Sequence, residues 1–181
     1  DIHLVSGDGP LNGCVPSDRL DKCIQDITKW HGDAKFCVIS GDLSEFAEKG
    51  AYKSLKKKLL EFQIPCFLMI GNHDDRDLFQ SVFTNNPCDE NKFVQSSFET
   101  DDRVFIFLDT KKQGKNVHDG ELCENRLDWL KKQIINSGNK PTYLFMHHPP
   151  FDIGIPYMDN IRLFGSDQFL STLSHLSLIH I

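Results

Sequence analysis

The stretch IPCFLMIGNHDDR, residues 64–76, joins an apolar run to a dense group of polar side chains. The apolar run has the length of a buried strand, and Gly71 with Asn72 is ordinary turn chemistry. A turn rarely needs a histidine, two aspartates and an arginine in immediate succession. Because these side chains stand where the strand ends, we expect them to serve a functional site.

Strands and helices alternate on both sides of this stretch. Helical spacing of apolar residues predicts helices over 16–30, 47–62, 76–83, 122–138 and 166–175. Short apolar or alternating runs predict strands over 35–40, 64–70, 93–100, 103–110 and 141–146. Ser17 or Asp18 is the expected cap of the first helix, and Asp101 and Asp102 form the turn of a hairpin. This alternation predicts one α/β domain with strands flanked by helices.

Composition excludes several classes of protein. With 181 residues, 39% hydrophobic and 25% charged, the chain is long and apolar enough for a globular domain. No apolar run approaches the roughly 18 residues of a membrane span, so no membrane partner is expected. The net charge of -6 offers no basic surface for a nucleic-acid polymer. A small anionic substrate would therefore need a local positive centre.

Six cysteines are scattered singly, without a C-x-x-C pair. In a chain of this length they are interpreted as reduced thiols, which favours a cytoplasmic location, and disulfides of a secreted protein are the alternative. The sequence leaves the oligomeric state open, a homo-oligomer included.

Residue types that bind metals stand at almost every predicted strand end. In open α/β sheets, ligands gather outside the carboxyl ends of the strands. The residues there are Asp1 and His3, Gly41 and Asp42, the stretch 71–76, Asp109 and Thr110, and the stretch 147–150. In an extended chain Asp1 and His3 point to the same side. Carboxylate, imidazole and amide ligands suit manganese, iron, cobalt or zinc, and they exclude a thiolate zinc site.

Four motifs carry a resemblance to a known family. DIH at 1–3, GD at 41–42, GNHDDR at 71–76 and FMHHPPFDIGIPYMD at 145–159 resemble the calcineurin-like metallophosphoesterase superfamily. The last two are most similar to its bacterial branch of glycerophosphodiesterases and class III 3',5'-cyclic-nucleotide phosphodiesterases. The resemblance implies a metallophosphoesterase-type αββα sandwich, with mixed β-sheets flanked by helices. The final Gly-His-x-His motif of the family is absent, so residues 1–181 are expected to be a single domain truncated at both ends.

The resemblance also implies a role for each matching residue. Asp1 and His3 would bind one divalent metal ion, Asp42 would bridge two, and Asn72 and His147 would bind the second. His73 would not be a ligand but would face the substrate phosphate, as a stabiliser of the transition state or a proton donor. Asp74, Asp75, Arg76 and His148 have less defined roles: the first three would orient the site or form salt bridges, and His148 would support it, contact substrate or face solvent.

Three functions are compatible with these residues. The first is a dinuclear phosphodiesterase that hydrolyses a 3',5'-cyclic nucleotide or a glycerophosphodiester by attack of a metal-bridging hydroxide. The second is a phosphomonoesterase or nucleotide pyrophosphatase on the same scaffold. The third is a binding module without catalytic activity. The five matching ligand residues disfavour it for the parent protein, but the absence of the two metal-binding histidines of the final motif keeps it open for residues 1–181.

Overall fold

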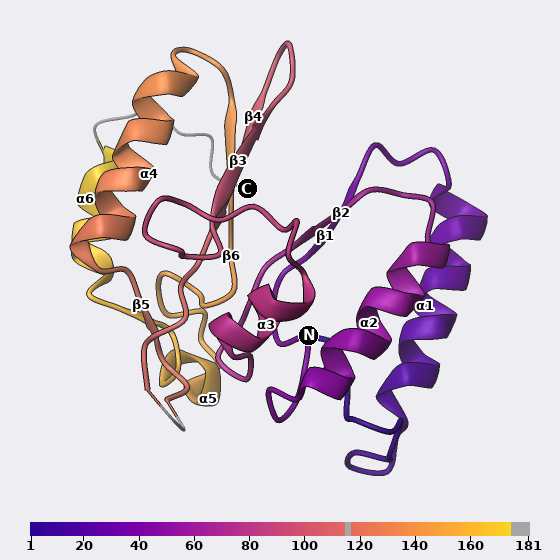
Figure 1. Ribbon diagram of the computed structural model, residues 1–181. Coiled ribbons are helices and arrows are strands. Elements are labelled where there is room, and N and C mark those ends of the chain that lie inside the picture. Colours follow the sequence, from indigo (N-terminus) through magenta and orange to yellow (C-terminus); the bar gives the residue numbers. More distant parts are fainter. Residues whose placement is uncertain (115–116, 175–181) are drawn as a thin grey trace. The chain divides into compact units, whose positions relative to one another are not determined.

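The computed structural model describes residues 1–114 and 117–174 of the chain (Figure 1). The chain divides into two units, Asp1–Asn86 and Pro87–Ile181. The last residue of the helix expected over 166–175, and the segment after it, lie outside the described residues. The expectation of a single domain stays a prediction.

The first unit is built on two parallel strands and three helices. Strand β1 (Cys37–Ile39) pairs in parallel with β2 (Cys66–Leu68), and α2 (Lys49–Glu61) connects them. Helix α1 (Pro16–His31) runs beside α2, where Lys58 forms an ion pair with Asp21 (Figure 1). Helix α3 (Arg76–Val82) follows β2 and packs against α2. The buried core includes Leu4, Leu43, Tyr52, Leu55 and Phe79.

The described residues of the second unit form two small sheets. Strands β3 (Ser96–Glu99) and β4 (Val104–Leu108) form the expected antiparallel hairpin, and β6 (Thr142–Met146) pairs in parallel with β4. The other sheet joins β5 (Gly120–Glu121) and β7 (Leu163–Phe164) in parallel. The helices are α4 (Glu124–Ser137), α5 (Pro156–Asp159) and α6 (Ser166–Ser174). Strand β4 packs with α4 and α6 in a buried apolar cluster. The cluster includes Ile106 and Leu108 of β4, Trp129 and Leu130 of α4, and Phe169 of α6.

These elements confirm the expected α/β class with mixed sheets and flanking helices. The expected cap of α1 is wrong, because Val15 occupies the N-cap position without a side-chain hydrogen bond. Pro16 takes the first helical position, where its fixed φ and missing N–H are tolerated. Ser17 is therefore buried inside the first turn.

Three short elements had no signal in the sequence: β5, β7 and α5. Two-residue strands are too short to show an alternating pattern, so their pairing is decided by contacts with distant segments. No helix among the described residues has the length and hydrophobicity to cross a membrane.

Candidate metal centre

Backbone hydrogen bonds hold the N-terminal segment against the loop that follows β1. The amides of Ile2 and His3 both donate to the carbonyl of Asp42, at 2.9 and 2.8 Å. The Leu4 amide donates to the carbonyl of Leu43 at 3.0 Å, and Leu4 is fully buried. A motif at the start of the chain is thus fixed beside a motif forty residues later.

His3 and Asp42 both adopt left-handed backbone conformations, with φ of 50° and 48°. The expectation that Asp1 and His3 lie in one extended segment is therefore wrong at His3. Histidine and aspartate tolerate this region better than most residues, and such strain concentrates at functional sites. Gly41, with φ of 118°, supplies a conformation that side chains rarely adopt at the end of β1.

His3, Asp42 and His73 form a cluster in the first unit. Each offers a ligand atom, and these atoms lie within 4.8 Å of one another. The Nε2 atom of His3 lies 3.6 Å from Oδ2 of Asp42, and the two histidine rings meet edge to face at 4.9 Å. The backbone amide of His73 donates to Oδ1 of Asp42 at 2.9 Å. Asp42 is buried, whereas both rings are about one quarter exposed, which suits a site open to a small ligand.

The two other predicted ligands of this unit lie in the same loops. Asp1 is exposed, and one of its carboxylate oxygens lies within 4.8 Å of an oxygen of Asp42. Asn72 is half-buried between Gly71 and His73. His73, predicted to face the substrate, lies as near to His3 and Asp42 as a metal ligand would.

Glu45 belongs to this cluster, although the sequence did not single it out. Its Oε2 lies 2.8 Å from Nδ1 of His3 and 3.6 Å from Nδ1 of His73. Its backbone carbonyl is 2.9 Å from the same Nδ1 of His73, which makes the carbonyl the acceptor for an Nδ1–H. The one available signal was an acidic residue three positions after Asp42, and acidic residues are common in loops.

Asp74 ties the loop after β1 to the loop after β2. Its carboxylate accepts hydrogen bonds from the amides of Leu43, Ser44 and Gly71 and from the hydroxyl of Tyr52, at 2.9 to 3.1 Å. Burial raises the pKa of Asp74, and its three backbone donors oppose that rise. Of the two predicted roles for Asp74, orientation of the site is the one that these contacts support.

Asp75 and Arg76 begin helix α3. The Asp75 side chain caps the helix by accepting from the amide of Leu78 at 2.8 Å, and its own amide donates to the Tyr52 hydroxyl at 2.9 Å. Burial and the nearby Asp74 charge raise the pKa of Tyr52, so its hydroxyl stays a donor to Asp74. The three residues after Asn72 thus have different roles. His73 lies in the cluster, Asp74 fixes the backbone of the two loops, and Asp75 fixes the start of helix α3.

His147 and His148 follow β6 in the second unit. His147 is half-buried, and its role as a metal ligand stays a prediction. His148 is only 2% exposed, so it does not face solvent. Its Nδ1 lies 2.7 Å from the Thr110 hydroxyl and its Nε2 lies 3.2 Å from the carbonyl of His118.

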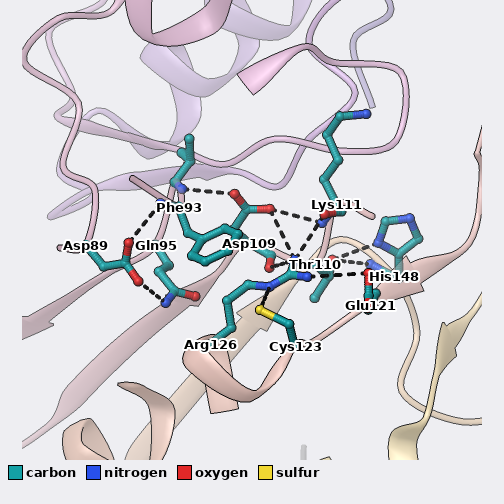
Figure 2. A network of polar contacts seen from close by, with 11 residues as sticks. Asp89, Phe93, Gln95, Asp109, Thr110, Lys111, Glu121, Cys123, Arg126 and His148 are labelled. Carbon is teal, nitrogen blue, oxygen red and sulfur yellow. Dashed lines mark hydrogen bonds and ion pairs between the residues drawn. The ribbon is translucent and has the colours of Figure 1, made fainter. Parts of the chain in front are cut away.

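A buried polar network surrounds the end of β4 in this unit (Figure 2). Asp109 accepts from the amides of Val94 and Lys111, at 2.9 and 3.0 Å. Arg126, from α4, donates to the carbonyls of Asp109 and Lys111 and lies over the ring of Phe93. Since Thr110 follows Asp109 and contacts His148, the network joins the ends of β4 and β6.

The residues of the first unit fit a divalent cation. The buried Nδ1 atom of His3 has no hydrogen-bond partner, because its contact with Glu45 lacks hydrogen-bond geometry. Imidazole nitrogens and carboxylate oxygens are the donors that borderline divalent ions accept. The site would hold such an ion through His3 and Asp42, with Asp1 beside them.

Comparison with known proteins finds similarity over nearly the whole chain. Residues 1–178 match the family described as calcineurin-like phosphoesterase. A probable cyclic nucleotide phosphodiesterase of Rhodopseudomonas palustris is 37% identical over 92% of this chain and 61% of its own length. A probable glycerophosphodiester phosphodiesterase of Arcobacter nitrofigilis is 31% identical over 88% of this chain and 58% of its own length. The chain thus spans less than two thirds of the length of these relatives.

A solved structure shares the fold at low sequence identity. The dimetal phosphatase from Danio rerio superposes with a TM-score of 0.70 over 88% of this chain and 68% of its own, at 15% identity. This likeness confirms the metallophosphoesterase-type fold. With the family match extending from the first residue almost to the last, the chain belongs to the calcineurin-like phosphoesterase family.

Proposed function

We propose that the protein hydrolyses a small phosphodiester, of the cyclic-nucleotide or glycerophosphodiester class, at a centre of two divalent metal ions. The observation that carries this proposal is the convergence of His3, Asp42 and His73, whose ligand atoms lie within 4.8 Å although they come from three separate loops. The names of the two relatives support a diester as substrate.

The proposed ligands divide between the two metal sites. Asp1 and His3 would hold the first ion, Asp42 would serve both, and Asn72 and His147 would hold the second. When bound, a metal pair lowers the pKa of a shared water and neutralises charge on the phosphate, which prepares the water to attack phosphorus. Manganese, iron, cobalt and zinc all accept this mixture of ligands.

His73 is proposed to assist departure of the leaving alkoxide. With Nδ1–H donated to the carbonyl of Glu45, Nε2 is the ring atom that can transfer a proton. Glu45 is then a positioning residue: its carbonyl accepts from Nδ1 of His73, and its carboxylate lies 2.8 Å from Nδ1 of His3.

Asp42→Asn tests this proposal. The substitution keeps the shape of the side chain but removes the charge shared by both metals, so manganese binding and diester hydrolysis should both be lost. Isothermal titration with manganese and turnover of bis(p-nitrophenyl) phosphate are the measurements, and Asp33→Asn, at an exposed position, is the matched control. Full turnover with metal retained in Asp42→Asn would refute the bridging role.

A substrate panel tests the reaction class. Cyclic nucleotides and glycerophosphodiesters should be hydrolysed in the presence of manganese faster than p-nitrophenyl phosphate, a monoester. A preference for the monoester would instead favour a phosphomonoesterase on this fold.

A further inference from the structure

Two cysteines lie directly opposite each other in the sheet of the first unit. The parallel register pairs Cys37 of β1 with Cys66 of β2. Paired residues of neighbouring strands point to the same face, here the face of Ile39 and Leu68. Neighbouring strands are about 4.7–4.9 Å apart, which falls within the range of about 4.4–6.8 Å between the Cα atoms of a disulfide.

The two thiols are half-buried, as is that of Cys123, and each donates to a backbone carbonyl: Cys66 to Ile64 at 3.4 Å and Cys37 to Val38 at 4.0 Å. The neighbouring Cys66 thiol lowers the pKa of Cys37 to about 7, against the opposing effect of burial. The neighbouring Cys37 and burial raise the pKa of Cys66. The lowered pKa favours the thiolate of Cys37, and the thiolate is the form that reacts with oxidants. Cys14, Cys23 and Cys88 are exposed, and Cys123 is half-buried.

We propose that Cys37 and Cys66 are a reactive dithiol that a peroxide converts into a disulfide bond between β1 and β2. The Cys37 thiolate attacks one oxygen of hydrogen peroxide, the O–O bond breaks, and a sulfenic acid and hydroxide form. The Cys66 sulfur then attacks the sulfenic sulfur, an S–S bond forms, and the S–O bond breaks to release water. Two electrons pass from the two thiols to the peroxide, and two waters are the net product.

This disulfide differs from a buried structural one in its exposure. Both cysteines are partly exposed, and exposed disulfides are easier to reduce than buried ones. The modification is thus reversible, which is typical of a redox-sensitive site.

Peptide mapping of the wild-type protein tests the proposal independently of its substrate. Reduced protein is treated with a few equivalents of hydrogen peroxide, free thiols are alkylated, and the protein is digested with trypsin. The expected product is a cross-link between peptides 36–49 and 59–76, each of which holds one of the two cysteines, and dithiothreitol should remove it. Alkylation of both cysteines after peroxide treatment, or cross-links confined to the other four, would overturn the proposal.

Variants separate the two steps. In Cys66→Ser the sulfenic acid on Cys37 has no partner, so dimedone should label Cys37 and no cross-link should form. Cys23→Ser, at an exposed position on α1, is the matched control and should keep the cross-link. Dimedone labelling of Cys66 rather than Cys37 in the wild-type protein would show that the order of attack is wrong. If Cys66→Ser does not fold, the wild-type map still decides whether the dithiol exists.

Discussion

Asp74 is the residue on which the geometry of the first unit most depends. One buried carboxylate accepts from the amides of Leu43, Ser44 and Gly71, and these amides lie in the two loops that carry Asp42 and His73. A buried amide without an acceptor costs about 1–3 kcal/mol. The side chain therefore stabilises the conformation of both loops rather than contributing a ligand.

Asp74→Ala should destabilise the protein by about 2–4 kcal/mol, because the three amides lose their acceptor together. The measurement is the free energy of unfolding from urea denaturation. The matched control is Asp33→Ala, at an exposed position, where the change should stay within about 0.5 kcal/mol. Equal stability of Asp74→Ala and the wild-type protein would contradict the role of this carboxylate.

The position of His73 is compatible with two roles, that of a metal ligand and that of a proton donor. Its ligand atom lies within 4.8 Å of those of His3 and Asp42, yet the proposed mechanism uses it as a proton donor. A metal ligand and a proton donor respond differently to removal of the ring, so one substitution separates them.

His73→Ala should lower kcat by about 10²- to 10⁴-fold while manganese binds as in the wild-type protein, because general acid catalysis contributes in this range. Turnover of bis(p-nitrophenyl) phosphate and isothermal titration with manganese measure the two effects. His31→Ala, an exposed histidine at the end of α1, is the matched control. Loss of metal from His73→Ala would make His73 a ligand instead.

Among the elements, β5 lies close against the segment after β6. A Cβ added to Gly120 of β5 would lie 2.5 Å from Cγ of His148 and 2.7 Å from its Nδ1. His148 is held at the same time by Thr110, at the end of β4. Gly120 is thus needed for the approach of β5 to the segment after β6, since a larger residue would push His148 away from Thr110.

Gly120→Ala should destabilise the protein by about 1–3 kcal/mol, because the added methyl group overlaps a buried ring. Thermal unfolding followed by circular dichroism measures the change. Gly9→Ala is the matched control, since a Cβ at Gly9 would have no neighbour within 4 Å and its backbone is not left-handed. A variant of Gly120 as stable as that of Gly9 would mean that His148 can move without loss.

For the whole molecule, the proposed metals predict a dependence of stability on their concentration. A ligand that binds only the folded state stabilises it by about 2.7 kcal/mol at 100 times its dissociation constant. Manganese at that concentration should raise the free energy of unfolding by this amount, and EDTA should reverse the effect. In Asp42→Asn the shift should disappear, and in Asp33→Asn it should persist. A shift of the same size in both variants would place the stabilising ion elsewhere.

Much of the local structure followed from periodic patterns in the sequence. Helices α2, α4 and α6 and strands β1, β2, β4 and β6 lie inside their predicted ranges, and α1 extends one residue beyond its range, to His31. Apolar spacing reports which face of a helix or strand is buried, and that information is local. The two-residue strands β5 and β7 and the four-residue α5 are too short to carry such a pattern.

The sequence was enough to indicate a metal-dependent phosphoesterase. Metal-ligand residues stand at several predicted strand ends, and four motifs resemble those of one family. The sequence was not enough to show that His3 and Asp42 take left-handed conformations, that Glu45 belongs to the cluster, or which amides Asp74 binds. Apart from Gly71, the described partners of Glu45 and Asp74 come from segments tens of residues away in sequence. Their roles depend on which backbone amides and rings folding brings within hydrogen-bond distance, and only the tertiary structure contains that information.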